Sequence, residues 1–547
     1  MKKLITLLAA APLCLSAQDL TTTIDVDHTV VPVEIQASPL AGVRMNIQQS
    51  APALSPMSTA DYAGEARIEA SSDSIAIAYP SQLPPVSEYR GYVAGAYGPT
   101  YNLGVQAGYA LVRDSLTDLS LSGSYSGTSY LSRAAAVNRT AADNSISAAL
   151  RFNRRMGRVL MEADASYIYS SVKSPWNDIS RTNDLNLADA RVRLYSHGPR
   201  IDWEARAGWD YAESGSALDA VGDKTGGSYN SNFNVGGDLW WHRGRRHHGF
   251  LLKMDFFAGM EKSTYASAYD PIYRDTSYYG NVLLGWRWLR KHFRAEVGVR
   301  TDMFSDGAVF LRIHPNVDLQ WTPKGWLSIF ASTHSDIRPG SLRQAYEYSH
   351  FLPGNYAAGI NYRFWIINIG LNLKPLPGLE VKAKVRYNQS DGALGIYSGY
   401  APEIPYDISS DVCTKWSFDG VVRYSHPWHS ITASVEYRHY FGEGHDLLDF
   451  GNMDCARDAL SIGLQGKITD ALTARATFSY RNDRSILGYR SMWLEDMAKL
   501  DLSAYYELNK RLTVGLALNN ITNREWLVLP GISCQGFTAV ALAQYKF

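Results

Sequence analysis

The sequence lacks a long hydrophobic run, an excess of charge of either sign, and cysteine in quantity. No stretch of about 20 apolar residues occurs in the 547-residue chain, which excludes a helical membrane protein. Lysine plus arginine equals aspartate plus glutamate, at 53 each. This balance argues against a general nucleic-acid binder, because such a protein needs a basic surface. Of the four cysteines, Cys413, Cys455 and Cys534 lie beyond the N-terminal region, and their spacing matches no zinc site.

The chain is instead rich in aromatic residues and glycine, with 35 Tyr, 17 Phe, 14 Trp and 44 Gly, and 46% of its residues are hydrophobic. Such a chain can bury ample apolar surface, which excludes a disordered protein. A soluble multi-domain β protein and a membrane β-barrel remain as alternatives.

The N-terminus predicts export from the cytoplasm. Lys2 and Lys3 precede an apolar run over residues 4–15, and a small residue, Ala17, follows. This order is typical of a secretory signal peptide, and the run is too short to span a bilayer as a helix. We therefore assign residues 1–17 to a signal peptide that is cleaved near Ala17.

Alternation with a period of two runs through most of the remaining chain. In residues 379–387, one face carries Leu379, Val381, Ala383, Val385 and Tyr387, and the other carries Glu380, Lys382, Lys384 and Arg386. The same split recurs over residues 159–167, 201–211 and 293–300. Successive side chains of a β-strand point to opposite faces, so this pattern predicts strands.

Two details favour a membrane barrel over a soluble sandwich, which also alternates. The polar face carries charges of both signs along whole strands, which suits a wet lumen, and aromatic residues gather near the strand ends. Short links alternate with long polar ones, as periplasmic turns alternate with outer loops in such barrels. The short links fall at 197–200, 323–325, 375–378, 469–470 and 509–511. The long links are expected near 132–143, 173–183, 213–227, 261–276, 335–356, 391–412, 443–456 and 482–495.

The predicted fold class is all-β: a transmembrane antiparallel β-barrel of about 22 strands over residues 88–547, preceded by a short, largely irregular periplasmic or luminal segment over 18–87. The weakest strands are 308–321, which contains Pro315, and 526–536, because proline is awkward inside a ladder. Gly536 leads a final alternating strand that places Tyr545 and the terminal Phe547 on one face. This ending resembles the signal read by the outer-membrane insertion machinery.

The penultimate strand resembles that of TonB-dependent receptors. In that family an apolar strand ends in paired asparagines, followed by a polar turn, an aromatic residue and a glycine-led last strand ending in Phe. Asn519 and Asn520 match the pair, Trp526 the aromatic and Phe547 the terminus. The resemblance covers the barrel and implies an outer-membrane receptor or transporter whose lumen is filled by an N-terminal plug.

Residues 18–87 depart from that family, because they are too few for a full plug and contain none of its motifs. An open barrel of this size would be a large hole, so we expect this segment, or inward-folded loops, to occlude it at least partly. An extended, β-branched stretch near the start could pair with TonB or with another sheet edge, or it could be a simple tether. Its apolar residues are Ile24, Val26, Val30, Val31 and Val33.

Aromatic residues in two predicted outer loops form a candidate platform for a ligand or partner, with an extended aromatic girdle as the alternative. They are Tyr346, Tyr348, Phe351, Tyr356, Tyr397, Tyr400 and Tyr406. Cys413 and Cys455 are expected at the same end of the barrel, so the sequence is compatible both with a disulfide between them and with two free thiols. No spacing of residues brings together a nucleophile, a base and a group that orients the base. We therefore predict that the chain is not an enzyme and has no catalytic site, metal site or cofactor.

Two functions follow, from different classes. One is a receptor or transport-derived barrel without a full plug, as the resemblance implies. The alternative is a non-transporting accessory barrel that docks partners in an outer-membrane assembly or secretion complex. Either would reside in the outer membrane of a Gram-negative bacterium, among lipid and lipopolysaccharide. The expected protein partners are the insertion machinery and TonB or other envelope proteins, without nucleic acid.

Overall fold

The computed structural model describes residues 89–547 except for parts of the links between strands. The residues outside the description are 100, 133–138, 177–178, 219–223, 243–247, 265–272, 306–308, 340–342, 344–359, 402–403, 427–429, 442–455, 489–491 and 530–531. No helix among the described residues is long and apolar enough to cross a membrane.

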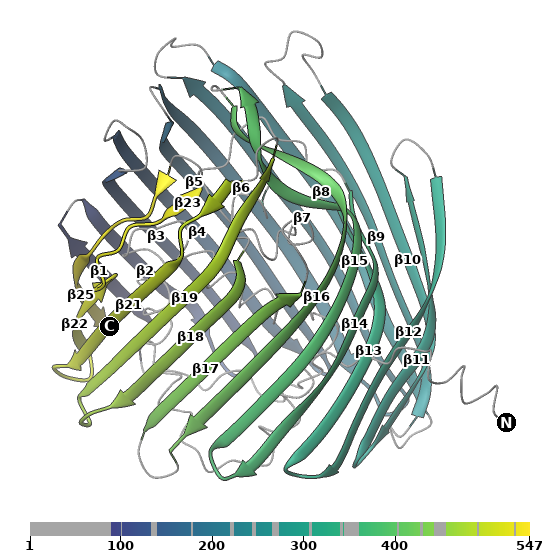
Figure 1. Ribbon diagram of the computed structural model, residues 1–547. Coiled ribbons are helices and arrows are strands. Elements are labelled where there is room, and N and C mark those ends of the chain that lie inside the picture. Colours follow the sequence, from purple (N-terminus) through teal and green to yellow (C-terminus); the bar gives the residue numbers. More distant parts are fainter. Residues whose placement is uncertain are drawn as a thin grey trace.

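The described chain is almost entirely antiparallel strand (Figure 1). The first half comprises β1 (Gly91–Gly98), β2 (Asn102–Arg113), β3 (Thr117–Ser132), β4 (Arg139–Met156), β5 (Val159–Trp176), β6 (Ile179–His197), β7 (Ile201–Leu218), β8 (Lys224–His242), β9 (His248–Thr264), β10 (Tyr273–Arg290), β11 (Phe293–Ser305) and β12 (Val309–Lys324). The second half comprises β13 (Leu327–Pro339), β14 (Ile360–Leu376), β15 (Leu379–Ala401), β16 (Ile404–Ser425), β17 (Ile431–Phe441), β18 (Ala456–Lys467), β19 (Leu472–Gly488), β20 (Met492–Leu494), β21 (Met497–Glu507), β22 (Leu512–Asn519), β23 (Leu527–Leu529), β24 (Ile532–Ser533) and β25 (Thr538–Lys546).

These strands close into a barrel because the last strand pairs with the first. β25 runs antiparallel to β1 from Tyr92↔Lys546 to Tyr97↔Ala541. β20 and β21 both pair with β19 and share one position, and β23 and β24 form a separate small sheet. The closed barrel therefore has 22 strands, which confirms the predicted fold class and strand number.

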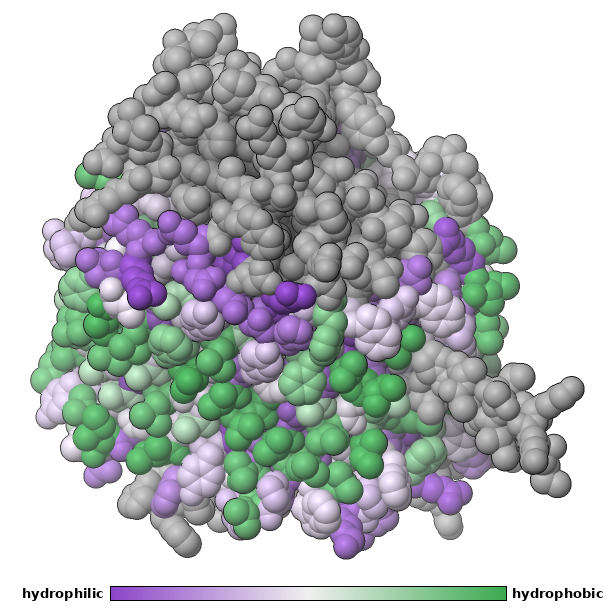
Figure 2. Space-filling view, viewed as in Figure 1, coloured by the Kyte–Doolittle hydropathy of each residue, from purple (hydrophilic) through white to green (hydrophobic). Residues whose placement is uncertain are grey.

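The two faces of the wall divide as the alternation predicts. On β7, Ile201 is 43% exposed on the outer surface, whereas Asp202 faces inward and is 4% exposed. On β15, Val385 is exposed outward and Lys384 reaches an inward carboxylate. Figure 2 shows the result, a band of apolar side chains over the lower wall with hydrophilic side chains above it. The outward apolar side chains suit contact with lipid, and the inward polar side chains suit contact with water.

The short turns form where the sequence places them, but the strands run further into the long links than expected. β6 ends at His197 and β7 begins at Ile201, as predicted. By contrast, β15 and β16 extend through most of the predicted loop 391–412, and β5 and β6 extend through most of 173–183. These extensions keep the antiparallel ladder, because backbone groups pair equally well beyond the apolar band, where alternation no longer marks a strand.

The two weakest predicted strands have different outcomes. Pro315 lies within β12, opposite Val299 on β11, so residues 308–321 do contain a barrel strand. Residues 526–536 do not form one, because they hold the β23–β24 hairpin between β22 and β25.

A small apolar cluster covers the inner face of the closing seam. It unites β1, β21, β22 and β25 through Ala94, Ala96, Tyr505, Ala517, Val540 and Leu542. Ala94 and Ala96 on β1 and Val540 and Leu542 on β25 bring apolar contact to the seam, which reinforces the backbone ladder there.

Candidate functional site

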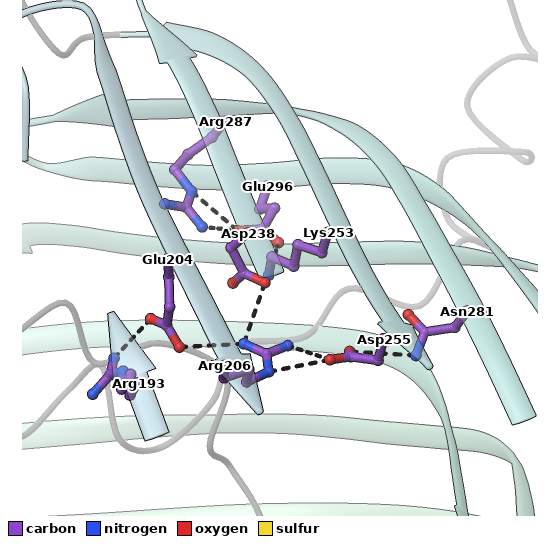
Figure 3. A network of polar contacts seen from close by, with 9 residues as sticks. All are labelled: Arg193, Glu204, Arg206, Asp238, Lys253, Asp255, Asn281, Arg287 and Glu296. Atoms are coloured by element: carbon purple, nitrogen blue, oxygen red, sulfur yellow. Dashed lines mark hydrogen bonds and ion pairs between the residues drawn. The ribbon is translucent and has the colours of Figure 1, made fainter. Parts of the chain in front are cut away.

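The inner wall carries a chain of ion pairs from β6 to β9 (Figure 3). Arg206 on β7 lies at its centre, with Nη1 3.3 Å from Glu204 Oε1 and 3.4 Å from Asp238 Oδ1. Its Nη2 lies 2.5 Å from Asp255 Oδ1 on β9. Arg193 Nη2 on β6 in turn lies 2.8 Å from Glu204 Oε2. One guanidinium is thus shared among three carboxylates.

A second, more deeply buried group of ion pairs lies beside the Arg206 pairs, on β9, β10 and β11. Lys253 Nζ lies 2.6 Å from Glu296 Oε1, and Arg287 Nη2 lies 3.0 Å from Glu296 Oε2. Glu296 and Arg287 are each only 2% exposed. Both carboxylate oxygens are therefore engaged by cations, as a charge removed from water requires.

The wall on the other side of the lumen has the reverse arrangement around Asp419 on β16. Its Oδ2 lies 3.1 Å from Lys384 Nζ on β15, and its Oδ1 lies 2.6 Å from Arg438 Nε on β17. Here one carboxylate is shared between two cations.

Arg343 brings a charge into the lumen from the link between β13 and β14. Its Nη1 lies 2.7 Å from Asp189 Oδ1 on β6, and its Nη2 donates to Ser166 Oγ on β5 at 3.4 Å. Ser166 also donates to Asp189. β6 and β13 are separated by six intervening strands, so Arg343 lies against a distant part of the wall.

The chain between β22 and β25 also folds inward and is held by the asparagine pair. Asn520 adopts a left-handed backbone, with φ of 48°, and its Nδ2 donates to the carbonyls of Arg524 and Gln535. Tyr130, on the luminal face of β3, donates its hydroxyl to the carbonyl of Ser533 at 3.1 Å. The hairpin is therefore fixed to the inner wall.

Chemically, this lumen offers a polar, charged lining and two inward contacts from connecting segments. Among the residues that the structure describes, no three or more His, Cys, Asp or Glu side chains are placed to hold a metal ion. The fixed pairs suit passage or binding of a polar molecule along a hydrated wall.

The predicted site residues are only partly described. The segment with Ile24, Val26, Val30, Val31 and Val33 lies outside the described residues, as do Tyr346, Tyr348, Phe351 and Tyr356. Tyr397 and Tyr400 belong to β15 and Tyr406 to β16, so their segment is strand rather than the predicted loop, and their side chains lie outside the description. Cys413 belongs to β16 and Cys455 is not described.

The predicted terminal residues are in place. Gly536 lies just before β25, and Tyr545 and Phe547 both face outward, 45% and 48% exposed, with ring centroids 6.4 Å apart. Sequence reasoning missed Arg343, because nothing near it in the sequence identifies a partner on β6. It found Asn520 through the resemblance but not its contacts with Arg524 and Gln535.

Comparison with known proteins places the fold. No protein-family model matches the sequence, and no curated protein matches it. Among solved structures, the FrpB iron transporter of Neisseria meningitidis shares 13% identity at a TM-score of 0.65, over 86% of this chain and 82% of that one. The siderophore receptor PirA of Acinetobacter baumannii shares 9% identity at 0.62, over 85% and 81%. A ferric enterobactin receptor of Pseudomonas aeruginosa shares 10% at 0.59, over 84% and 80%.

At these identities the likeness concerns the fold. The chain has the 22-strand barrel fold of TonB-dependent outer-membrane receptors, as the C-terminal resemblance implied.

Proposed function

We propose that this chain is an outer-membrane receptor or transport barrel that works without a full plug. The carrying observation is the charged inner wall, centred on Arg206 and its three carboxylates, inside a closed barrel with the fold of uptake receptors. A polar solute that crosses the barrel must exchange its hydration for polar groups on the wall, and this lining supplies such groups.

The remaining parts of the proposal rest on sequence. Residues 1–17 act as the signal peptide, and the barrel enters the outer membrane through the insertion machinery, which reads Gly536, Tyr545 and Phe547. The segment around Ile24 to Val33 pairs with TonB or with another envelope protein. The aromatic residues over 346–356 and 397–406 bind ligand or partner.

Uptake in the native host tests the proposal. The solved structures with this fold include a ferric enterobactin receptor and an iron transporter, so ferric enterobactin is a suitable first probe, followed by other metal chelates. Deletion of residues 19–33 is expected to abolish uptake, while the barrel remains heat-modifiable on gels. A matched deletion of residues 51–65 controls for mere shortening.

Pull-down from native membranes provides the opposing outcome. Stoichiometric envelope partners, combined with unchanged uptake across the panel, would overturn the transport proposal in favour of the accessory barrel.

A further inference from the structure

The inner face of β17, β18 and β19 carries an excess of cations. These three strands lie side by side in the barrel (Figure 1). Among their described inward side chains the bases are Arg438, Arg457, Lys467, Arg475 and Arg481, and the acid is Glu436. Charges that line a wall of low dielectric reinforce one another, so a solute in the lumen meets a positive surface there.

Strand pairing and exposure fix the inward orientation of these side chains. Ile462 and Leu464 on β18 are 41% and 52% exposed on the outer surface, and Val435, the partner of Ile462 on β17, is 39% exposed. Successive side chains of a strand point to opposite faces. The odd-numbered residues 457–467 of β18 therefore face the lumen, together with their ladder partners on β17 and β19.

Arg438 and Arg481 stand at the same height of the wall, on either side of Ala459. Ala459 pairs with Arg438 in the β17–β18 ladder and with Arg481 in the β18–β19 ladder. The two arginine backbones are thus two strand spacings apart, roughly 10 Å. Because Ala459 carries only a methyl group, both long side chains can approach one solute above it.

The carboxylate of Asp419 orients Arg438 without cancelling the charge of this surface. Asp419 Oδ1 lies 2.6 Å from Arg438 Nε, and its Oδ2 lies 3.1 Å from Lys384 Nζ. One negative charge is shared by two cations, and the Arg438 side chain is still 21% exposed. The surface therefore keeps its positive excess after these pairs form.

Hydroxyl groups lie beside the two arginines on the same face. Ser461 on β18 and Ser479 on β19 are ladder partners, one inward position below Ala459 and Arg481. Ser434 on β17 extends this polar row over Gly463, where an added Cβ would lie 2.8 Å from its Oγ. Glycine at 463 thus leaves room for a third hydroxyl.

Guanidinium and hydroxyl donors together match a phosphate group. Arginine presents a planar fork of N–H donors that binds phosphate oxygens in pairs. Hydroxyls donate to the oxygens that the forks leave over, and each adjusts its hydrogen to suit. A phosphate between Arg438 and Arg481 would have both kinds of donor within one row of the wall.

We propose that Arg438, Arg481, Ser461 and Ser479 form a luminal binding site for a phosphate-bearing solute. The inference rests on the proposed function, because it names the class of solute that the lumen receives. Arg475 and Lys467 continue the positive surface toward the short turn between β18 and β19. A solute that leaves the site therefore remains beside a favourable wall.

Reaction of an introduced cysteine with charged thiol reagents tests the site in the purified full-length protein. In a background with Cys413, Cys455 and Cys534 changed to Ser, Ser461→Cys is treated with an anionic and a cationic methanethiosulfonate. The control is Asn234→Cys on β8, which faces the lumen beside the outward Val235. Relative to free thiol, preference for the anionic reagent should be at least about five-fold higher at 461 than at 234.

Pyrophosphate distinguishes a binding site from a merely positive surface. At about 1 mM it is expected to slow labelling of Ser461→Cys at least about three-fold and to leave Asn234→Cys unaffected. Anionic preference without this protection would overturn the proposal, because the wall would then attract anions without holding them. Equal preference at both positions would also overturn it, as would a folded protein in which neither reagent reaches Ser461→Cys.

Three variants assign the effect to the named residues. Arg438→Gln combined with Arg481→Gln should abolish protection, whereas Arg151→Gln combined with Arg191→Gln removes the same charge from β4 and β6 and should preserve it. Both control side chains face water, at 70% and 69% exposed. Ala459→Leu keeps every charge but fills the space between the arginines, so it should also abolish protection. Heat-modifiability verifies folding of each variant.

The outcome is independent of uptake, because labelling is measured on purified protein. Protection that survives the arginine pair of changes, or Ala459→Leu, would overturn the site while leaving the transport proposal intact. Unchanged uptake on deletion of residues 19–33, with protection retained, would overturn the transport proposal and leave the phosphate site standing.

Discussion

Arg343 and Asp189 form an ion pair of 2.7 Å between the link that follows β13 and the inner face of β6. Their side chains are 11% and 10% exposed, so the pair is largely shielded from water. Since strands β7–β12 lie between the two attachment points, the contact ties two separate parts of the barrel together. The pair holds the Arg343 side chain against the inner wall.

Loss of this pair should open the pore. Arg343→Ala and Asp189→Asn are each expected to raise single-channel conductance in planar bilayers about two-fold or more, and the double variant no further, as a shared interaction requires. Arg191→Ala is the matched control, because Arg191 lies 3.7 Å from the same carboxylate but on the same strand. Additive effects of the two changes would contradict a shared role.

Glu296 should contribute strongly to stability. Glu296→Gln leaves Lys253 and Arg287 with a neutral partner in a buried place, which is expected to lower the free energy of unfolding by about 3 kcal/mol. Heat-modifiability in urea measures the loss. Asp164→Asn is the control: its pair with Arg151 is 49% and 70% exposed, and its removal should cost less than about 1 kcal/mol. Similar losses for both would show that burial does not govern these pairs.

Asn520 should anchor the β23–β24 hairpin through both its backbone and its side chain. Asn520→Gly keeps the left-handed φ but removes the two side-chain donations, at about 1 kcal/mol each. Asn520→Ala should lose about 1 kcal/mol more, because a Cβ disfavours that conformation. Protease cleavage within 524–535 reports hairpin release. Equal cleavage of wild type and both variants would refute the anchoring role.

Cys534 should resist alkylation at moderately alkaline pH. Burial disfavours the thiolate and raises the pKa of the Cys534 thiol to about 12, so the reactive form is scarce until the pH approaches that value. With Cys413 and Cys455 changed to Ser, N-ethylmaleimide at about pH 8.5 should label Cys534 at least about a hundred-fold more slowly than a cysteine at the exposed Lys510. Unfolding in urea should equalise the rates. Rapid labelling of the folded protein would contradict the burial of this hairpin.

Phe547 should act through its ring in assembly and through its backbone in closure. Its carbonyl accepts from the amides of Arg90 and Gly91, while its ring stacks 6.3 Å from that of Tyr109. Phe547→Ala should slow insertion yet leave the mature barrel heat-modifiable, whereas deletion of Phe547 should also weaken closure. Pulse-chase assembly followed by gel shift measures both steps. Equal outcomes for the two changes would assign the residue a single role.

The sequence by itself determined the wall of this barrel. Whether Val385 meets lipid and Lys384 meets water is decided by neighbours one residue apart, so the alternation reveals strands, faces and short turns. The asparagine pair at 519–520 likewise marks where β22 ends, because a left-handed residue there needs a side chain that tolerates it.

Only the tertiary structure decided what lies across the lumen. Arg343 meets Asp189 because the barrel closes and brings β6 within reach of the link after β13, which no local pattern encodes. The length of β15 and β16 was also decided by the tertiary structure. Their ladder pairing continues beyond the apolar band, where apolar and polar residues no longer alternate along the sequence. A balanced count of charges told nothing of their arrangement. The closed barrel turns them inward, where Arg206, Glu296 and Asp419 meet partners on neighbouring strands, because each strand's inward face is fixed by the lipid on its outward one.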